Sequence, residues 1–129
     1  MKTVEDILMV KGSEVIVSSP TETVLDAARV MAEAHVGSVV IRRDDRVVGL
    51  FTERDLLSRV VAAGRDPATT CLPDVMSSPV QTCRLSDDLE DCARRMSEQK
   101  IRHLVVVEQD ALVGMISLRD ILLVRRDKP

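Results

Sequence analysis

The stretch Gly49-Leu50-Phe51-Thr52-Glu53-Arg54-Asp55-Leu56-Leu57 decides how this chain folds, because it predicts a short apolar strand that runs directly into a helix. The stretch occurs twice. Adding 65 to each number gives Gly114-Met115-Ile116-Ser117-Leu118-Arg119-Asp120-Ile121-Leu122, in which the glycine, the hydroxyl, the arginine and the aspartate keep their places. Two copies in one register predict a chain that is built from two similar structural units.

Each copy places a hydroxyl residue three positions before an aspartate at the expected start of the helix. This spacing is typical of a capping box, in which both side chains satisfy free backbone N–H groups. The same place also suits a ligand, because the positive end of a helix dipole attracts anions and the preceding glycine leaves room. For Thr52 and Ser117 the two roles are compatible. For Asp55 and Asp120, helix capping alone and ligand binding remain two separate hypotheses.

The composition is that of a globular protein and disfavours two classes of partner. The chain has 129 residues, 45% of them hydrophobic, which is enough to bury a core. Its net charge is −3 and it contains no run of Lys and Arg, so we expect neither nucleic acid nor an anionic membrane as a partner. With one Phe and no Tyr or Trp, it also lacks the aromatic side chains on which single-stranded bases stack.

The cysteines and the N-terminus indicate an intracellular protein. Cys71, Cys83 and Cys92 are odd in number and have no C-x-x-C spacing, so the sequence predicts reduced thiols, with neither a disulfide framework nor a metal site. No apolar run reaches the roughly 20 residues of a membrane span, and the N-terminus is mixed and charged. We therefore expect a cytoplasmic protein.

The first half of the sequence predicts an ordered series of elements. A lead-in helix over residues 3–10 ends at Gly12, and a strand over residues 14–17 follows. Thr21 is expected to cap the next helix, which ends near Gly37 with His35 as a capping residue. Residues 39–41 and 47–48 flank a charged turn and predict a hairpin. An apolar helix over residues 56–63, closed by Gly64, completes the half.

The second half repeats this order after a linker. Residues 65–73 contain Pro67 and Pro73 and show no periodicity. A strand over residues 80–83, a helix capped by Ser86 and a hairpin of residues 104–107 and 112–115 follow. The sequence predicts a first repeat with its lead-in helix at residues 1–64, a linker at 65–73 and a second repeat at 74–129. The expected fold is α+β, with two pseudo-symmetric β-α-β-β-α repeats packed sheet to sheet.

The doubled order of elements and two motifs resemble a tandem pair of cystathionine-β-synthase (CBS) domains, called a Bateman module. The motifs are Gly49…Thr52-x-x-Asp55 and Gly114…Ser117-x-x-Asp120. Together with Ile101-Arg102-His103-Leu104, they resemble the stand-alone bacterial two-CBS proteins in particular, over almost the whole chain. The resemblance implies two clefts between the repeats that bind an adenosine compound, namely AMP, ADP, ATP, NAD(H) or S-adenosylmethionine, and thereby regulate a partner.

The residue types suit such a ligand. A carboxylate repels a phosphate but can accept both hydroxyls of a ribose, which is the role we expect for Asp55 and Asp120. Thr52 and Ser117 can donate to the ribose or to a phosphate. Four basic residues are expected to contact a phosphate. The resemblance implies this role for Arg102 and His103, and Arg54 and Arg119 are expected to share it because they precede the two aspartates.

The resemblance also implies that each pocket combines residues of both repeats. One pocket joins Ser117 and Asp120 to Val17, Val36, Gly37, Ser38 and Met115. The other joins Thr52 and Asp55 to Leu50, Val80, Ile101 and Arg102. Aliphatic side chains would hold the adenine, because the chain has so few aromatic residues.

Two departures from the family pattern make the clefts unequal. Val105 stands where the family often has proline, and Leu118 stands at the place that Glu53 occupies in the first repeat. The first motif therefore carries an extra negative charge beside Thr52. We expect a phosphorylated ligand to prefer the cleft of Asp120.

The sequence favours a regulatory module over an enzyme. Two histidines and three scattered cysteines offer no visible pair of nucleophile and base. The favoured function is ligand sensing in signal transduction, and the alternative is a structural dimerisation module without a ligand. A regulated enzyme or transporter is an open possibility for the partner.

A homodimer is expected, because two apolar helices carry more hydrophobic surface than one small domain covers. The first contributes Leu56, Leu57, Val60 and Val61, and the second contributes Ile121, Leu122, Leu123 and Val124.

Overall fold

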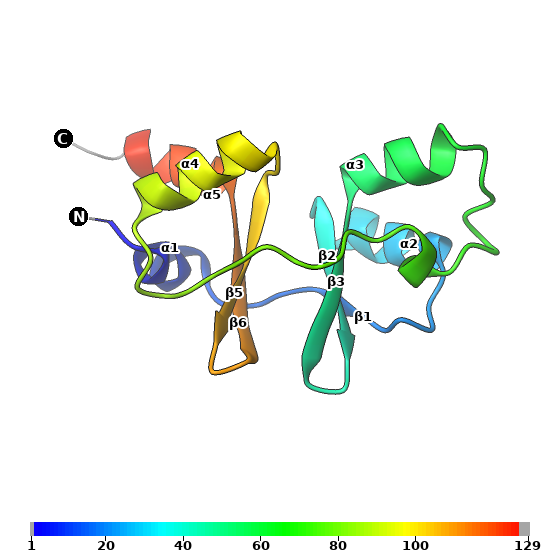
Figure 1. Ribbon diagram of the computed structural model, residues 1–129, viewed down its shortest axis with the longest axis horizontal. Coiled ribbons are helices and arrows are strands. Elements are labelled where there is room, and N and C mark those ends of the chain that lie inside the picture. The colour runs from blue at the N-terminus through cyan, green and yellow to red at the C-terminus, as the bar shows by residue number, and fades with distance from the viewer. Residues whose placement is uncertain (1, 127–129) are drawn as a thin grey trace. The chain divides into compact units, whose positions relative to one another are not determined.

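The computed structural model describes residues 2–126, which form two compact units (Figure 1). One unit runs from Val15 to Val80. The other combines the chain up to Glu14 with the chain from Gln81 onward. Each unit contains one three-stranded sheet with helices, so the predicted α+β class is confirmed.

The first unit has the predicted order of strands and helices. β1 (Val17–Ser18) pairs in parallel with β2 (Ser38–Arg43), and α2 (Val24–Ala34) connects them. β2 then pairs antiparallel with β3 (Arg46–Thr52), so the strand order is β1-β2-β3. The connection between β2 and β3 is the charged turn that the sequence predicts.

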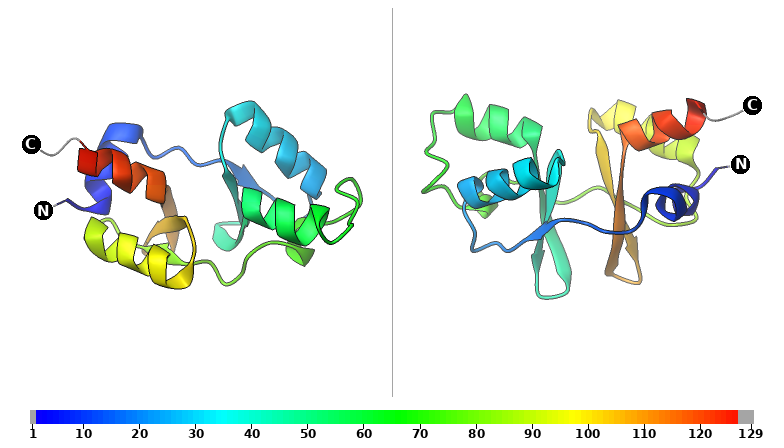
Figure 2. Two further views of the ribbon diagram at one scale, coloured as in Figure 1. Left: turned by 90° about the horizontal axis from the view of Figure 1, so that it is seen from above. Right: turned by 180° about the vertical axis from the view of Figure 1, so that it is seen from behind.

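The second unit repeats this arrangement. β4 (Thr82–Cys83) pairs in parallel with β5 (His103–Glu108), which pairs antiparallel with β6 (Ala111–Ser117). α4 (Leu89–Gln99) connects the two parallel strands, and α5 (Leu118–Arg126) follows β6. α4 and α5 contact each other and lie side by side in the view from above (Figure 2).

The N-terminal helix α1 (Val4–Lys11) packs in the second unit, whereas the sequence analysis assigned it to the first repeat. Val4, Ile7 and Leu8 are buried in the core that α4, β5, β6 and α5 form. Val4 N donates to Asp87 O at 3.0 Å, which ties the helix to the loop before α4. No local sequence pattern reveals a hydrogen bond between residues so far apart in the chain. The sequence analysis therefore assigned the helix to the repeat that follows it directly.

In the first unit, part of the predicted linker packs where α1 packs in the second unit. The 3₁₀ turn η2 (Leu72–Asp74) places Leu72 and Val75 in the core of the first unit. Leu72 N donates to Glu22 O at 3.2 Å, as Val4 does to Asp87 in the second unit. The first unit therefore extends to Val80, beyond the boundary expected from the prolines.

Two glycines at matching positions of the hairpins allow these segments to pack closely. A Cβ at Gly114 would lie 2.9 Å from Leu8 Cδ1, and a Cβ at Gly49 would overlap Met76 Sδ. Both contacts are closer than real Cβ atoms come to other heavy atoms. The glycines of the repeated stretch thus admit an apolar side chain from outside the hairpin.

The starts of α2 and α4 lie two residues later than expected. Thr23, not Thr21, caps α2, and its Oγ1 accepts from Asp26 N at 3.2 Å. Asp88, not Ser86, caps α4. At the other ends, His35 and its counterpart Lys100 both adopt φ of 57°, so the predicted capping role of His35 is confirmed.

The helix after β3 differs from its counterpart α5. α3 (Glu53–Asp55) passes directly into η1 (Leu56–Val61), a π-helical segment in which Ala62 N donates to Leu57 O at 2.8 Å. The sequence predicts a helix here but not its wider turns. Within the segment Val60 is fully buried, whereas Leu57 and Val61 are 65% and 61% exposed.

Candidate ligand-binding sites at two helix starts

Both copies of the repeated motif form a complete capping box. In the first unit, Thr52 Oγ1 accepts from Asp55 N at 3.1 Å, and Asp55 Oδ2 accepts from Thr52 N at 3.0 Å. In the second, the distances are 3.1 Å from Asp120 N to Ser117 Oγ and 2.8 Å from Ser117 N to Asp120 Oδ2. The capping role of the four residues is therefore confirmed.

Asp55 is held by two further residues of its own unit. Ser77 Oγ lies 3.1 Å and 3.2 Å from its two carboxylate oxygens, and Arg59 Nε lies 3.6 Å from Oδ1. The Asp55 side chain is only 8% exposed. A ribose that bound this carboxylate would compete with the Ser77 hydroxyl.

Asp120 has a cation as its neighbour. Lys11 Nζ lies 2.9 Å from Asp120 Oδ2 and donates to Met115 O at 3.0 Å. The Asp120 side chain is 19% exposed, more than that of Asp55. The last residue of α1 thus brings a positive charge to the second helix start.

Sequence reasoning missed Lys11, Ser77 and Arg59 as neighbours of the two aspartates. Lys11 and Asp120 are 109 positions apart, and Ser77 and Asp55 are 22 apart, so spacing could not reveal either contact. Arg59 stands four residues after Asp55, and the helical i,i+4 rule could have identified this pair.

The starts of β2 and β5, with the residues just before them, bring further predicted residues to the same helix starts. Ser38 pairs with Thr52 in the first sheet, and His103 pairs with Ser117 in the second. Glu53 N donates to Gly37 O at 3.0 Å, as Leu118 N does to Arg102 O at 2.9 Å. Within each unit the predicted site residues therefore gather where the hairpin meets its helix.

The other predicted residues are distributed over the same two units. Val17 pairs with Val40 in the first sheet, and Leu50 exchanges backbone hydrogen bonds with Ser77 at 3.0 Å and 2.8 Å. The remaining half-buried aliphatic residues are Val36 and Val80 in the first unit, and Ile101 and Met115 in the second. The structure defines each unit by itself, so the pockets that combine residues of both units stay predictions.

The charges near the two helix starts differ. A Cβ at Gly37 would lie 3.3 Å from Glu53 Oε1, so this carboxylate lies beside the loop that precedes β2. Its counterpart Leu118 packs instead against the core of the second unit. Arg54, Arg102 and Arg119 are exposed. The first site therefore carries a negative charge that the second one lacks at this position.

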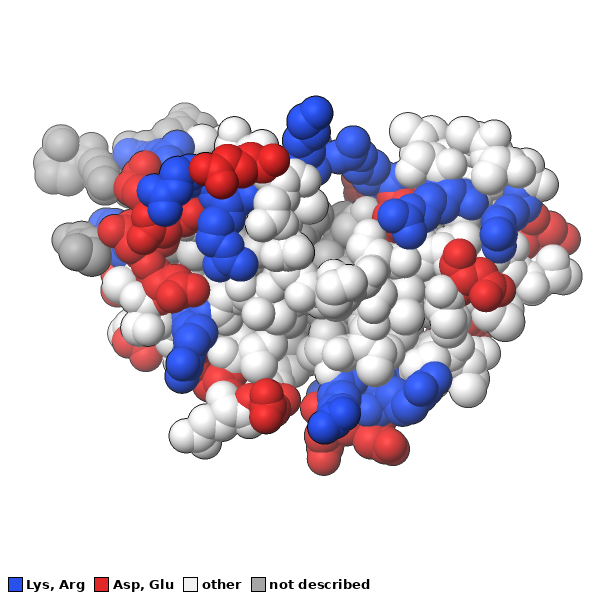
Figure 3. Space-filling model, viewed as in Figure 1, with Lys and Arg blue, Asp and Glu red and all other residues white. Residues whose placement is uncertain are grey.

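Elsewhere the surface charges are mixed. Along α4, Arg94 lies 2.8 Å from Asp91 and 3.9 Å from Glu98, and basic and acidic side chains alternate over this helix (Figure 3). On α4, paired basic and acidic side chains thus offset one another. Among residues 2–126, no helix has the length and apolar character needed to cross a membrane.

Comparison with a family model identifies the fold. The model described as "CBS domain" matches residues 4–62 and again residues 73–127. This chain belongs to the CBS domain family. The resemblance inferred from the repeated motif is thereby confirmed.

Two related proteins match most of this chain in sequence. The uncharacterized protein MK0525 of Methanopyrus kandleri is 38% identical over 111 residues, which are 84% of this chain and 57% of MK0525. The CBS domain-containing protein YhcV of Bacillus subtilis is 33% identical over 109 residues, which are 84% of this chain and 77% of YhcV. The chain thus spans little more than half the length of the first relative.

Solved structures agree with the fold. A protein with CBS domains from Burkholderia ambifaria has a TM-score of 0.94 at 30% identity, covering 99% of this chain and 97% of its own. A hexameric CBS-CP12 protein from bloom-forming cyanobacteria has a TM-score of 0.85 at 27% identity, covering 99% and 77%. The CBS pair of MJ0100, in complex with 5′-methylthioadenosine and S-adenosylmethionine, has a TM-score of 0.88, covering 100% and 99%. Its 21% identity indicates the fold alone.

Proposed function

We propose that this CBS pair is a regulatory module that binds an adenosine-containing compound. The compound belongs to the group of AMP, ADP, ATP, NAD(H) and S-adenosylmethionine. The proposal depends on one observation, which is that both units hold an aspartate in a capping box where the hairpin meets its helix. The carboxylate is thus fixed in place before any ligand arrives.

The chemistry of this place suits a ribose and its phosphates. A carboxylate accepts the two hydroxyls of a ribose, and the first turn of a helix offers N–H groups to a phosphate. Arg54 and Arg119 follow the capping residues and are exposed, so their guanidinium groups are accessible to a phosphate. Arg102 stands just before β5 and adds to this positive charge, and His103, the first residue of β5, offers an imidazole N–H to a phosphate.

The fold of MJ0100 supports the ligand class. That protein binds two adenosine compounds in a CBS pair whose backbone superposes on this chain at a TM-score of 0.88. The architecture is therefore compatible with adenosine ligands, and the residues at the two helix starts decide which compound binds here.

We propose that the helix start of Asp120 is the preferred site for a phosphorylated ligand. Lys11 brings a cation to this carboxylate and is 38% exposed, so its ammonium group can also reach a phosphate. At the other helix start, Arg59 likewise brings a cation to Asp55, but the Ser77 hydroxyl lies within hydrogen-bond distance of both carboxylate oxygens, and Glu53 adds a negative charge nearby.

A second candidate function is a structural dimerisation module without a ligand. The engagement of both Asp55 oxygens by Ser77 favours it, because this aspartate then serves the unit itself. In either case the chain acts through a partner, such as an enzyme or a transporter, and performs no catalysis of its own. We infer a cytoplasmic location for this activity.

A thermal-shift panel separates the two functions. Protein shown by native mass spectrometry to be free of bound ligand is heated with AMP, ADP, ATP, NAD(H) or S-adenosylmethionine, and with inosine and guanosine compounds as controls. A ligand that binds only the folded state at a hundredfold excess over Kd adds about 2.7 kcal/mol of stability, which raises the Tm by several degrees. The absence of any adenosine-dependent shift would favour the structural module.

A further inference from the structure

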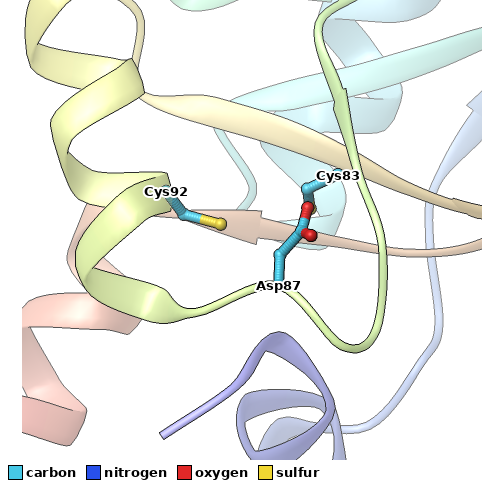
Figure 4. A group of neighbouring side chains, drawn as sticks. All are labelled: Cys83, Asp87 and Cys92. Carbon is cyan, nitrogen blue, oxygen red and sulfur yellow. The ribbon is translucent and has the colours of Figure 1, made fainter.

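A cluster of two thiols and one carboxylate lies in the second unit and shares no residue with the two candidate binding sites. Cys83 is the last residue of β4, Asp87 lies in the following loop, and Cys92 is on the second turn of α4. Their ligand atoms all lie within 4.8 Å of one another. Figure 4 shows the Cys92 and Asp87 side chains directed toward the place where Cys83 lies.

The surroundings of this cluster hold its members in place. Cys83 and Cys92 are 2% and 0% exposed, whereas Asp87 is half-buried and borders the solvent. Arg84 N donates to Asp87 Oδ2 at 2.9 Å, which fixes the carboxylate. Arg95 Nη1 lies 4.0 Å from the same oxygen, while Arg95 Nη2 donates to Thr82 O at 2.6 Å. A fixed guanidinium group therefore stands beside the cluster.

The first repeat shows what these positions contain without the cluster. The residues 65 positions earlier are Ser18, Glu22 and Ala27, which keep a carboxylate but offer no thiol. A packed core thus needs no sulfur at either place. The two cysteines are a feature of the second repeat alone, at two positions that face each other.

We propose that Cys83, Asp87 and Cys92 form a binding site for one divalent ion of the zinc class. Two sulfur ligands and one carboxylate oxygen are a donor set that zinc accepts, and zinc commonly takes four ligands in a tetrahedron. A water molecule on the side of Asp87 supplies the fourth ligand. The sequence predicts no metal site because the separations of four and five residues match no familiar cysteine motif.

The charges balance when the ion binds. Each thiol releases its proton to solvent as its sulfur binds the metal, and no oxidation or reduction takes place. Two thiolates and one carboxylate carry three negative charges, the ion carries two positive charges, and the guanidinium of Arg95 compensates for the remainder. The two thiols also share a hydrogen bond, which lowers the pKa of Cys92 and raises that of buried Cys83.

Metal titration of the reduced, chelator-treated chain tests the site. We expect one Zn²⁺ per chain, and with Co²⁺ we expect the absorption that arises from charge transfer between thiolate and cobalt. X-ray absorption of the zinc-loaded wild-type protein should show two sulfur ligands and otherwise oxygen or nitrogen. This last measurement needs no variant and so does not depend on how a substitution affects folding.

Three variants locate the site. The double variant Cys83→Ser, Cys92→Ala carries the residues of the first repeat and should lose stoichiometric zinc binding while keeping the circular dichroism of the wild type. Cys71→Ser removes the exposed third thiol and should bind zinc as the wild type does. Asp87→Asn should retain the cobalt–thiolate absorption with at least about tenfold weaker affinity, because one charged ligand is lost.

Three results would overturn the proposal. The first is reduced, folded wild-type protein that takes up no stoichiometric zinc. The second is zinc binding that persists in the double variant or disappears in Cys71→Ser. The third is X-ray absorption with fewer than two sulfur ligands. A wild-type chain that binds no zinc when reduced but forms a Cys83–Cys92 disulfide under mild oxidation would assign the pair to redox chemistry instead.

Discussion

Asp55 and Asp120 occupy matching places at two helix starts but have different neighbours. Asp55 is buried, accepts a hydrogen bond from Ser77 and forms an ion pair with Arg59, whereas Asp120 is more exposed and lies beside Lys11. The Ser77 hydroxyl lies within hydrogen-bond distance of both Asp55 oxygens, whereas the contacts of Asp120 with Lys11 and Ser117 are both made through Oδ2. The two carboxylates should therefore contribute unequally to binding.

Substitution of each aspartate by asparagine measures this inequality. Loss of a charged hydrogen bond to the ribose typically costs about 1.5–3 kcal/mol, so Asp120→Asn should weaken binding roughly ten- to a hundredfold. Asp55→Asn should weaken it less. An asparagine oxygen can still accept from the backbone at the helix start, so the unfolding midpoint of ligand-free Asp120→Asn, which loses only a partly exposed ion pair with Lys11, should hardly change. Asp55→Asn also loses its ion pair with Arg59 and one acceptor for Ser77 in a buried place, so its midpoint should fall. Calorimetric titration of the three proteins gives the affinities, and a larger loss for Asp55→Asn would contradict the asymmetry.

The contact between Gly114 and Leu8 allows a test of how α1 packs. A Cβ at Gly114 would lie 2.9 Å from Leu8 Cδ1, so Gly114→Ala should destabilise the protein by about 1–3 kcal/mol through overpacking. Leu8→Ala alone should cost about 2–5 kcal/mol, because it leaves a cavity. In the double variant the alanine methyl group occupies part of that cavity. The loss of stability should therefore be smaller than the sum of the two single losses by at least about 0.5 kcal/mol. Urea unfolding of the four proteins provides the cycle, and strict additivity would argue against this packing.

At the scale of residues, the sequence predicted the contacts between residues that are close in the chain. The capping boxes of Thr52 with Asp55 and of Ser117 with Asp120 followed from three-residue separations, which the backbone geometry of a helix start determines. The contact of Lys11 with Asp120 and the facing thiols of Cys83 and Cys92 depend on tertiary packing, which no local pattern reveals.

Among the elements, the helix starts show how one local rule can point to the wrong residue. Thr21 and Thr23 both have side chains that can cap a helix, and the sequence analysis chose the first. In the structure Thr21 Oγ1 lies 2.9 Å from Ser19 Oγ, in the turn before α2, and Thr23 accepts the hydrogen bond from Asp26 N. The same shift by two residues occurs at Asp88 before α4.

Matched alanine substitutions test this assignment. Thr23→Ala should destabilise the protein by about 1 kcal/mol, because Asp26 N loses its side-chain acceptor. Thr21→Ala should stay within about 0.5 kcal/mol of the wild type, as exposed positions away from caps usually do. Denaturant unfolding of the two variants decides between the residues. An equal or larger loss for Thr21→Ala would restore the original prediction.

The helix that follows each hairpin shows a second limit of sequence patterns. The apolar run after Asp55 predicts a helix but cannot distinguish α-helical from π-helical turns, since both leave a nearly continuous apolar surface. Among the described side chains of these two helices, the large apolar residues that are exposed are Leu57 and Val61 on η1, and Leu122 and Leu123 on α5. Val60 and Ile121, which the sequence analysis included in the dimer surface, are fully buried in the cores of their units.

At the scale of the molecule, we predict a homodimer that buries the exposed apolar residues of η1 and α5. A stable interface of this kind typically buries about 1,200–2,000 Å². Leu57→Glu or Leu122→Glu should dissociate the dimer, because each places a charge on a surface that association would bury. Val10→Glu is the control, since Val10 is 86% exposed but lies on α1. Light scattering at micromolar concentration gives the mass, and a monomeric wild type would contradict the prediction.

The internal repeat made the fold of the molecule predictable, but it could not predict that the N-terminal segment packs in the second unit. The shift of 65 residues identified two β-α-β-β-α units because each keeps its own motif and its own hydrophobic spacing. Chain order suggested that residues 2–14 belong to the first unit, but their buried side chains complete the second. Burial, and not proximity in sequence, decides where such a segment packs.

The central claim is that this CBS pair binds an adenosine compound through the carboxylates at its two helix starts. Isothermal titration calorimetry of the ligand-free wild-type chain tests it most directly, with the adenosine compound that gives the largest thermal shift and with its guanosine counterpart. We predict saturable binding of the adenosine compound, weakened by Asp120→Asn, and none of the guanosine compound. Folded, ligand-free protein that gives no saturable heat with any of the five adenosine compounds would contradict the claim.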